Sequence, residues 1–541
     1  MRLKQAESVQ KQVTSIQDRL DKLEQESHAK DQWSRSNNVE IKGVPQKNHE
    51  NLFEIVNQID KFTSPRLYPP GPKPLPLIGN LLSVALQLRS KKLHHEIWRK
   101  WARVYGNILG LRLGLMNVVI ISGKDFVREV SSREVFGGRP GGFFFLMRSF
   151  GKKSGLVFND GSSWTKTRRV VLKYLKDFGY NTRHMENYIS EECRALVQLR
   201  IKDAGQPVLI NNMFNITIVN ILWRLVAGKR YDLDDANLKL LCDIITRLFR
   251  AVDMSGGILN FLPFVRHVAP NLSGYNELCS IHKAIHDFLR ETIEQHERNL
   301  DVKNPKDVID AFLIEKMDPK NRTFSDEDLQ VVCLDLLEAG METVANTAVF
   351  MLLHIIRNDD IQKRLHDEID EVIGPLRPPT LSDRSRMVYT EAVLLEALRI
   401  SSVAAMGIPH MALEDAQLGN YVIPKGTFVL LALYDLHNGN HWKDPGAFRP
   451  ERFITKEGNL MQDEWLMPFG SGKRRCIGEG LARSELFMFL THLLQKFRLK
   501  LPEGDPIPSV EPNDGLSLSA KTYRLIFLPR NCNTQIVTEY V

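Results

Sequence analysis

Apolar residues recur at helical spacing along most of the chain, and this pattern dominates as far as about Leu398. The stretch Leu93–Tyr105 predicts a helix, whereas Ile108–Ile121, with alternating and β-branched residues around a Gly-Leu-Met-Asn break, predicts a hairpin. Loops are expected near residues 137–142, 253–257 and 375–380, and further short strands at 416–421, 427–432, 497–499 and 523–528. The chain is therefore expected to be mainly α, with a large helical domain and a small β-rich subdomain.

The first 62 residues follow a different pattern. Apolar residues from Val9 to Leu23 are spaced 4, 3, 4 and 3, which predicts either a short coiled coil or a single helix. A strand-like run at 35–45 and an amphipathic helix at 50–62 follow. This head resembles coiled-coil, nucleic-acid-chaperone-type proteins encoded by insect retroelements, and it is interpreted as a gene fusion or a chimeric gene model.

A proline-rich segment separates this head from the rest of the chain. It contains Pro-Pro-Gly-Pro at residues 69–72, and stacked prolines keep a chain extended and stiff. A generic linker and an SH3-type ligand are the alternatives to a hinge. The sequence thus divides into an N-terminal extension (1–62), a proline-rich hinge (63–80), a main domain (81–530) and a tail (531–541).

Composition and charge exclude several classes of protein. The 541 residues carry a net charge of +7 without a basic stripe interleaved with aromatics, so no nucleic-acid partner is expected for the main domain. Six cysteines are scattered without a C-x-x-C pair, which argues against a structural zinc site and a disulfide framework. Residues 1–68 contain neither an apolar run of about 20 residues, the length that spans a membrane, nor a secretory signal pattern.

One cysteine lies in a glycine-rich, arginine-flanked loop. The sequence from Phe469 to Gly478 reads Phe-Gly-Ser-Gly-Lys-Arg-Arg-Cys-Ile-Gly and precedes a helix-forming run at 479–497. Glycines let the backbone approach a flat group closely, and positive neighbours with a following helix N-terminus lower a thiol pKa. A rigid thiolate open on one side is suited to bind haem iron, whereas the alternative is a buried structural cysteine.

The loop matches the pattern F-x-x-G-x-R-x-C-x-G at Phe469, Gly472, Arg474, Cys476 and Gly478, and it resembles the haem-binding signature of the cytochrome P450 superfamily. The resemblance covers nearly all of the chain beyond the head and implies the cytochrome P450 fold. It also implies that Cys476 is the axial thiolate ligand of haem b, that Phe469 shields the sulfur from water, and that Arg474 binds a haem propionate.

The resemblance assigns two further motifs to the same cofactor. Trp164 and Arg168 are four residues apart and fall on one helix face, and both are implied to donate to a haem propionate. His410 stands where the family usually has another propionate-binding Arg or His. Taken alone, the tryptophan and arginine would be interpreted as core packing and surface charge.

A third motif begins at Ala339 and reads Ala-Gly-Met-Glu-Thr within a long apolar helical run. A glycine inside a helix costs about 1 kcal/mol against alanine. The resemblance implies that the helix opens at Gly340 where dioxygen binds, and that Thr343 and Glu342 help to deliver protons. The alternative is that Gly340 merely lets another helix pack closely. A valine at position 344 replaces the second hydroxyl residue that family members often have, which leaves the details of the proton relay open.

Glu396 and Arg399 form a fourth motif. They are three residues apart between apolar neighbours, which predicts that both side chains face inward, where buried charges need partners. The resemblance supplies Arg452, from Pro-Glu-Arg-Phe at 450–453, and implies a structural network of these three residues. The alternative is a surface ion pair, which stabilises little.

Taken together, the motifs resemble those of a microsomal monooxygenase that inserts one atom of dioxygen into a lipophilic substrate by hydroxylation or epoxidation. The resemblance implies electrons from NADPH through NADPH–cytochrome P450 reductase, with cytochrome b5 as an additional candidate donor, and a docking face that includes the positive residues at 166, 169 and 473–475. The family address is the cytosolic face of the endoplasmic reticulum membrane, although no membrane anchor is recognised in this sequence. A haem-thiolate isomerase or dehydratase that uses no external electrons, an inactive fusion, and an interaction protein that oligomerises through its N-terminal helix are the alternatives.

The layout most resembles insect relatives of the drug- and steroid-hydroxylating members, and Arg139–Phe145 with Asp177–Gly179 resembles the insect group that contains methyl farnesoate epoxidase. A role in the juvenile-hormone pathway and the detoxification of plant or synthetic lipophiles are the two hypotheses for its substrate. By analogy with the family, the substrate pocket is expected to draw on Phe143, Phe144, Phe145, Leu337, Val403, Ala404, Ala405, Met406 and Leu518.

Overall fold

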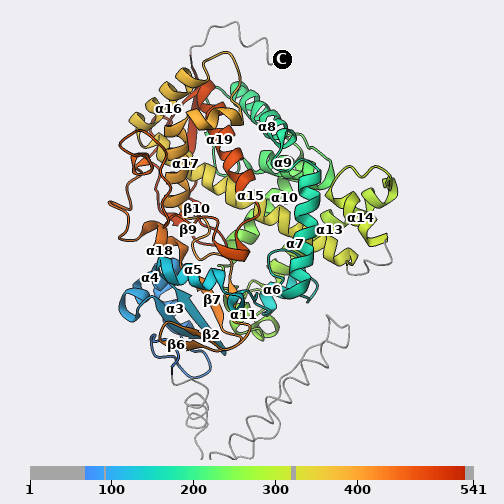
Figure 1. Cartoon of the computed structure of the whole chain (residues 1–541), viewed down its shortest axis with the longest axis vertical. Helices are drawn as coiled ribbons and strands as arrows, with labels where there is room; N and C mark the ends of the chain where they lie inside the picture. Colours follow the sequence, from blue (N-terminus) through green and yellow to red (C-terminus); the bar gives the residue numbers. More distant parts are fainter. Residues whose placement is uncertain (1–66, 91–92, 318–323, 531–541) are drawn as a thin grey trace, which may run out of the picture. The chain divides into compact units, whose positions relative to one another are not determined.

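A computed structural model describes residues 67–90, 93–317 and 324–530 (Figure 1). The elements predicted within residues 1–62, the first residues of the hinge and the tail from 531 lie outside these described residues. Within the described ranges, helices predominate and the strands form small sheets. The predicted fold class is therefore confirmed.

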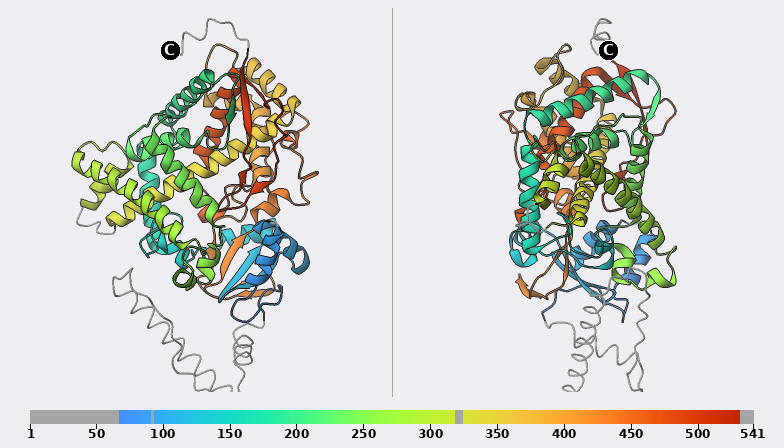
Figure 2. Two further views of the ribbon diagram at one scale, coloured as in Figure 1. Left: turned by 180° about the vertical axis from the view of Figure 1, so that it is seen from behind. Right: turned by 90° about the vertical axis from the view of Figure 1, so that its right-hand side faces the viewer.

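Helices form most of the domain in both views of Figure 2, with the largest sheet at one end. The longer helices are α3 (Leu81–Arg89), α4 (His94–Tyr105), α5 (Lys124–Ser132), α7 (Gly161–Asp177), α8 (Arg183–Lys202), α9 (Asn215–Ala227), α10 (Ala236–Ala251), α13 (Tyr275–Asn299), α14 (Val308–Met317), α15 (Asp326–Ile356), α16 (Asp359–Val372), α17 (Val388–Ser401) and α19 (Glu479–Lys496). The shorter ones are α6 (Phe143–Met147), α11 (Gly257–Phe261), α12 (Val265–Val268), α18 (Leu433–Asn438) and the 3-10 turns η1 (Glu134–Phe136), η3 (Leu381–Arg386), η4 (Pro450–Phe453) and η5 (Gly472–Arg474).

Helix α15 is the core helix that the apolar run predicted. A capping box starts it, because the hydroxyl of Ser325 accepts the backbone N–H of Asp328 and the Asp328 carboxylate accepts the N–H of Ser325. It packs against α9, α13, α17 and α19. Among the described helices, it has the length and apolar composition of a membrane span, but most of it is buried inside the protein.

The largest sheet joins two distant parts of the chain. Strands β1 (Ile108–Leu113) and β2 (Met116–Ile121) form the predicted hairpin, β7 (Phe428–Leu431) pairs parallel to β2, and β4 (His410–Met411) pairs antiparallel to β7. A further bridge between Met411 and Gly138 places His410 beside the segment that follows η1. The smaller sheets contain β3 (Pro207–Leu209), β11 (Arg524–Pro529) and β8 (Phe497–Lys500) in that order, β9 (Pro512–Asn513) with β10 (Ser519–Ala520), and β5 (Ala416–Leu418) with β6 (Tyr421–Ile423).

The prediction of one strand over residues 416–421 was wrong, since this stretch opens the β5–β6 hairpin. Gly419 makes the turn with φ +56°, a conformation that favours glycine. Strands β3, β4, β9 and β10 were not predicted, because each has only two or three residues and cannot display an alternating pattern.

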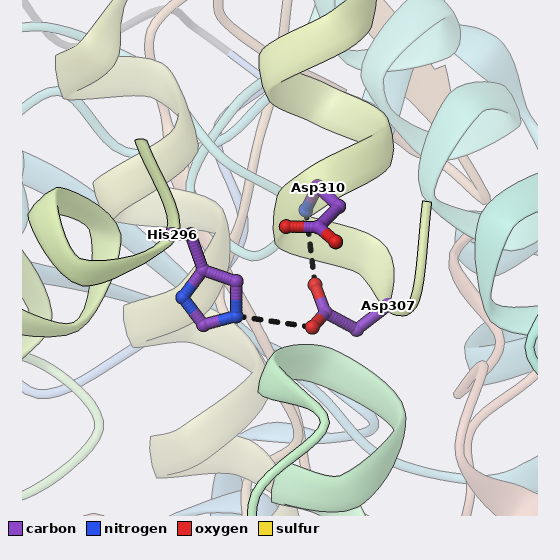
Figure 3. Close-up of side chains that lie close together, drawn as sticks. All are labelled: His296, Asp307 and Asp310. Carbon is purple, nitrogen blue, oxygen red and sulfur yellow. Dashed lines mark hydrogen bonds and ion pairs between the residues drawn. The ribbon is translucent and has the colours of Figure 1, made fainter. Parts of the chain in front are cut away.

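A partly buried ion pair joins the C-terminal end of α13 to the start of α14 (Figure 3). The imidazole of His296 donates from Nδ1 to the carbonyl of Thr292 (2.8 Å) and lies 3.0 Å through Nε2 from the Asp307 carboxylate. Asp307 also accepts the backbone N–H of Asp310 (2.9 Å) and so caps α14. Burial lowers the pKa of His296, but the hydrogen bonds to Asp307 and Thr292 and the charges of Asp307 and Asp310 outweigh it and raise that pKa to about 8.

The ion pair between His296 and Asp307 predicts a pH-dependent contribution to the stability of the protein. A folded-state pKa above the ordinary value of 6.5 means that the contribution is fully present below about pH 6.5 and is lost as the pH rises through about 8. The stability difference between the wild type and His296→Gln should be about 1 to 2 kcal/mol at pH 6 and should shrink by pH 9. Thermal unfolding of both proteins from pH 6 to pH 9 measures this stability difference. A difference that stays constant over this range would contradict an ion pair between a charged His296 and Asp307.

Candidate active site

A cavity of about 330 Å³ is lined by α15, α9, α7, the start of α19 and the loop that carries Cys476. It brings together residues that lie far apart in the sequence. The predicted site residues that line it are Trp164, Arg168, Ala339, Gly340, Thr343, His410, Phe469, Arg474, Cys476 and Gly478. The remaining predicted catalytic and cofactor-binding residues, Gly472 and Glu342, are not part of its lining, and neither are the predicted structural residues Glu396, Arg399 and Arg452.

The cysteine loop closes on itself, since the backbone N–H of Cys476 donates to the carbonyl of Phe469 (3.0 Å). Gly472 has φ +67°, and a Cβ there would lie 2.0 Å from the carbonyl oxygen of Ser131 at the end of α5. The sequence interpretation that Gly472 approaches a flat ligand is therefore corrected: its backbone approaches α5. Gly478 does line the cavity, immediately before α19.

The sulfur of Cys476 is open to the cavity. Burial raises the pKa of its thiol, whereas the backbone N–H groups of Gly478 and Glu479 and the charge of Arg168 act in the opposite direction. The first N–H groups of α19 thus point at the sulfur and would stabilise a thiolate. By contrast, Cys193, Cys242 and Cys333 are buried, and burial raises their pKa values, which is typical of core thiols.

Cationic side chains gather at one end of the cavity. Arg474 donates through Nη2 to the carbonyl of Gly137 (2.8 Å), stacks over the ring of Trp164, and leaves its buried Nη1 without a hydrogen-bond partner. Burial lowers its pKa to about 10. Arg168 donates to the carbonyl of Arg475 (3.2 Å), and burial lowers its pKa as well.

Arg139 is a site residue that the sequence did not predict. It lines the cavity, is buried, and donates to the carbonyls of Val157 (3.0 Å) and Pro409 (2.6 Å). Burial and the charge of Arg474 hold its pKa well below the ordinary value. Its only signal in the sequence is its place between a glycine pair and a proline.

His410 and Trp164 lie at the same end, but their N–H groups already have backbone partners. The Nδ1 of His410 donates to the carbonyl of Phe136 (2.8 Å), and burial with the charges of Arg139 and Arg474 lowers its pKa to about 3. The indole N–H of Trp164 donates to the carbonyl of Leu156 (3.1 Å). Both residues therefore border the cationic end of the cavity with these N–H groups turned to backbone carbonyls.

This arrangement fits haem. Among the described residues, no carboxylate forms an ion pair with the guanidinium of Arg139, Arg168 or Arg474. Arg139 is buried and the other two are half-buried, and cations removed from water need anionic partners. Haem propionates would supply them, apolar walls from Leu222, Leu336 and other residues suit the ring, and the open sulfur suits the iron.

The cavity-facing part of α15 carries Ala339, Gly340 and Thr343. The helix runs without a break from Asp326 to Ile356, and a local opening at Gly340 stays a prediction. A Cβ at Gly340 would lie 2.8 Å from the side chain of Leu222 on α9, which is the alternative that the sequence left open. The hydroxyl of Thr343 donates to the carbonyl of Ala339 (2.8 Å).

Glu342 is directed to a different set of partners. Its buried carboxylate accepts hydrogen bonds from Thr246 and Asn346 (2.8 Å) and pairs with Arg250 of α10 (3.2 Å). A direct proton transfer from Glu342 into the cavity is therefore not supported by this geometry. Thr343, in contrast, lines the cavity.

Glu396 and Arg399 of α17 are completely buried. Arg399 donates to both carboxylate oxygens of Glu396 (2.7 and 2.9 Å), and Arg452 from η4 lies 3.0 Å from the same carboxylate. Arg399 also donates to the carbonyl of His437 (2.7 Å). These contacts tie α17 to the segment that leads into the cysteine loop.

Most of the expected substrate-pocket residues belong to the core. Only Val403 and Ala404 of that set line the cavity. Phe144, Phe145, Leu337 and Leu518 are at least 95% buried in contacts with other apolar side chains. Periodicity could not separate them from pocket residues, because both groups are apolar.

Comparisons with known proteins agree with this geometry. A cytochrome P450 family model matches residues 69–527. Over 463 residues, the chain is 68% identical to the farnesoate epoxidase of Bombyx mori, and the match covers 86% of this chain and 94% of that protein. It is 34% identical to the probable cytochrome P450 305a1 of Drosophila melanogaster (88% and 97% covered) and 33% identical to the human cytochrome P450 2C8 (86% and 93% covered). The chain therefore belongs to the cytochrome P450 family, the haem-thiolate monooxygenases that use dioxygen and electrons from NADPH through a reductase.

Proposed function

We propose that this enzyme epoxidises a farnesoate-type substrate, an acyclic isoprenoid acid or its methyl ester. The 68% identity to a farnesoate epoxidase across 94% of that protein carries the proposal. The apolar side chains Leu336, Val403 and Ala404 along the cavity are compatible with such a lipophilic chain. An alkene, dioxygen, two electrons and two protons would give the epoxide and water.

We propose roles for six of the residues that line the cavity. Cys476 would ligate the haem iron, Arg139, Arg168 and Arg474 would neutralise the haem propionates, and Phe469 would shield the sulfur. Bound haem supplies the activation of dioxygen for oxygen-atom transfer. The Thr343 hydroxyl, which borders the cavity, would hold and pass a proton there.

Thr343→Ala is expected to uncouple electron use from product formation. The mutation removes the hydroxyl that donates to Ala339 and borders the cavity. Product formed per NADPH oxidised should fall by about tenfold, while NADPH oxidation continues. Thr292→Ala, which removes a hydroxyl donated within α13 to the carbonyl of Phe288 (3.0 Å) and lying outside the cavity lining, serves as the control. Unchanged coupling in Thr343→Ala would remove this residue from the mechanism.

The substrate proposal is tested with the purified enzyme, a reductase and NADPH. Farnesoic acid, its methyl ester and a non-isoprenoid lipophile are supplied in parallel, and products are identified by mass spectrometry. Epoxidation of one of the two farnesyl compounds at a rate well above that of the third supports the proposal. Comparable turnover of all three would instead favour broad detoxification.

We also propose that the catalytic domain attaches to the endoplasmic reticulum membrane through an apolar surface. Exposed apolar side chains include Leu77, Leu115, Phe264 and Leu272. The β1–β2 turn connects their segments, because the N–H of Gly114 donates to the carbonyl of Ile78 and its backbone packs against Phe261. Flotation with phospholipid vesicles should fall in the double substitution of Phe264 and Leu272 by glutamate, and unchanged flotation would refute this surface.

A basic surface near the cysteine loop is the proposed docking face for NADPH–cytochrome P450 reductase and cytochrome b5. Its exposed basic residues are Lys166, Arg169, Lys473 and Arg475. Arg474 was also predicted to belong to this surface, but it lines the cavity instead and is not included in the proposal. A negatively charged surface on the electron-donor protein would be attracted to these basic residues and would speed the association of the two proteins. Reduction by the reductase should slow with rising ionic strength more steeply in the wild type than in Lys166→Gln/Arg169→Gln, and identical salt dependence would contradict the assignment.

A further inference from the structure

Two side chains at the cationic end of the cavity depend on neighbouring backbone carbonyls. The guanidinium of Arg139 donates through Nε to the carbonyl of Val157 (3.0 Å), and the indole of Trp164 donates to the carbonyl of Leu156 (3.1 Å). The orientation of these consecutive peptide groups therefore fixes where both side chains lie.

The N–H groups of the same two residues are held by a single carboxylate on the opposite side. Oδ2 of Asp335, on α15, accepts the backbone N–H of Leu156 and that of Val157 (3.0 Å). Asp335 is 1% exposed. The chain reaches it through Gly155, which has φ +78° and at which a Cβ would lie 2.2 Å from Oδ2 of Asp335.

The other oxygen of Asp335 forms an ion pair with Arg148. Arg148 lies 2.6 Å from Oδ1 through Nη2 and contacts Glu338 at 2.8 Å through the same nitrogen. Arg148 is buried and its pKa is raised above the ordinary value, because the charges of Asp335 and Glu338 outweigh the effect of burial. With both oxygens occupied, Asp335 is not placed to exchange a proton with the cavity, although it borders it.

We propose that Asp335 is a positioning residue for haem retention. Through the peptide groups of Leu156 and Val157, it orients Arg139 and Trp164 toward the propionate end of the cavity, and Arg148 locks the carboxylate in this position. This inference rests on the proposed haem-binding role of Arg139 and concerns residues of this chain alone.

Asp335→Asn in the haem-loaded full chain tests the proposal. Asparagine has nearly the same size as aspartate, but an NH2 group replaces one carboxylate oxygen. This NH2 group would face either the N–H groups of Leu156 and Val157 or the guanidinium of Arg148, and it cannot accept a hydrogen bond from them. The rate at which haem passes to an excess of apomyoglobin is measured. It should rise about tenfold or more, as expected for losing charge-assisted hydrogen bonds, while the haem still bound keeps its thiolate spectrum, because the Cys476 loop is untouched.

Glu368→Gln is the matched control. The carboxylate of Glu368 also accepts two consecutive backbone N–H groups, those of Tyr389 and Thr390 (both 2.8 Å), but Glu368 does not line the cavity. It should lower thermal stability without changing the rate of haem loss. Equal rates of haem loss in Asp335→Asn and Glu368→Gln would overturn the proposal.

A double-mutant cycle with Arg139→Gln separates this inference from the proposed function. If Asp335 acts through Arg139, Asp335→Asn should accelerate haem loss much less in the Arg139→Gln background than in the wild type. Equal acceleration in both backgrounds would overturn the inference. If Arg139→Gln alone leaves haem loss unchanged, the proposed role of Arg139 fails instead. Arg148→Gln, which leaves Asp335 in place without its lock, gives the same readout if Asp335→Asn does not accumulate as folded protein.

Discussion

Replacing Cys476 by serine is expected to reduce epoxidation to the background rate, a loss of about a thousandfold or more, equivalent to roughly 4 kcal/mol. The sulfur of Cys476 is open to the cavity, and the first N–H groups of α19 point at it. A serine hydroxyl in the same place is a far weaker anion and a poor electron donor to iron. Product formation with a reductase and NADPH measures the effect.

Cys279→Ser is the control for this mutation. Cys279 is a partly exposed free thiol on α13, outside the cavity lining. It should retain wild-type turnover, so general sensitivity to losing a thiol would be visible in both variants. If Cys476→Ser binds as much haem as the wild type and still shows substantial turnover, Cys476 is not the ligand of the haem iron.

Glu396→Ala is expected to cause the largest loss of stability. Glu396 and Arg399 are fully buried, and removing the carboxylate leaves Arg399 and Arg452 without their shared anion. Breaking a buried pair by removing one partner costs about 3–5 kcal/mol. The variant should accumulate mainly without haem, because the network ties α17 to the segment before the cysteine loop. Haem content per protein and the unfolding temperature measure this outcome.

Glu391→Ala on the same helix provides the comparison. Glu391 pairs with Arg384 (2.7 Å), whose side chain is 26% exposed. Water can therefore solvate Arg384 after the mutation, and the loss should be about 1 kcal/mol or less. A haem-loaded Glu396→Ala protein as stable as Glu391→Ala would refute the structural role of the buried network.

The sequence predicted the elements that have long, strongly periodic patterns. The apolar run at 326–357 became α15, and the branched run at 108–121 became the β1–β2 hairpin. The cysteine loop could be located because its glycines and cysteine are spaced along a continuous stretch. In contrast, β3 exists only because the distant strand β11 supplies its partner, and no local pattern encodes such pairing.

Side-chain direction within the site was harder to predict. Glu342 adjoins Thr343 in the sequence, but the helical turn between consecutive residues sends its carboxylate toward Arg250 while Thr343 borders the cavity. Arg139 and Asp335 escaped notice because their importance lies in the carbonyls and N–H groups of residues 156–157. Such backbone-mediated contacts depend on tertiary structure and leave no residue-type signal.

The most direct test is the absorption spectrum of the purified protein after reduction under carbon monoxide. Ligation of haem iron by the Cys476 thiolate predicts a Soret band at the long wavelength diagnostic of that ligand, and this band should be absent from Cys476→Ser. A reduced, haem-loaded wild type that shows only the shorter-wavelength band of a neutral ligand, or a long-wavelength band that persists in Cys476→Ser, would contradict the account.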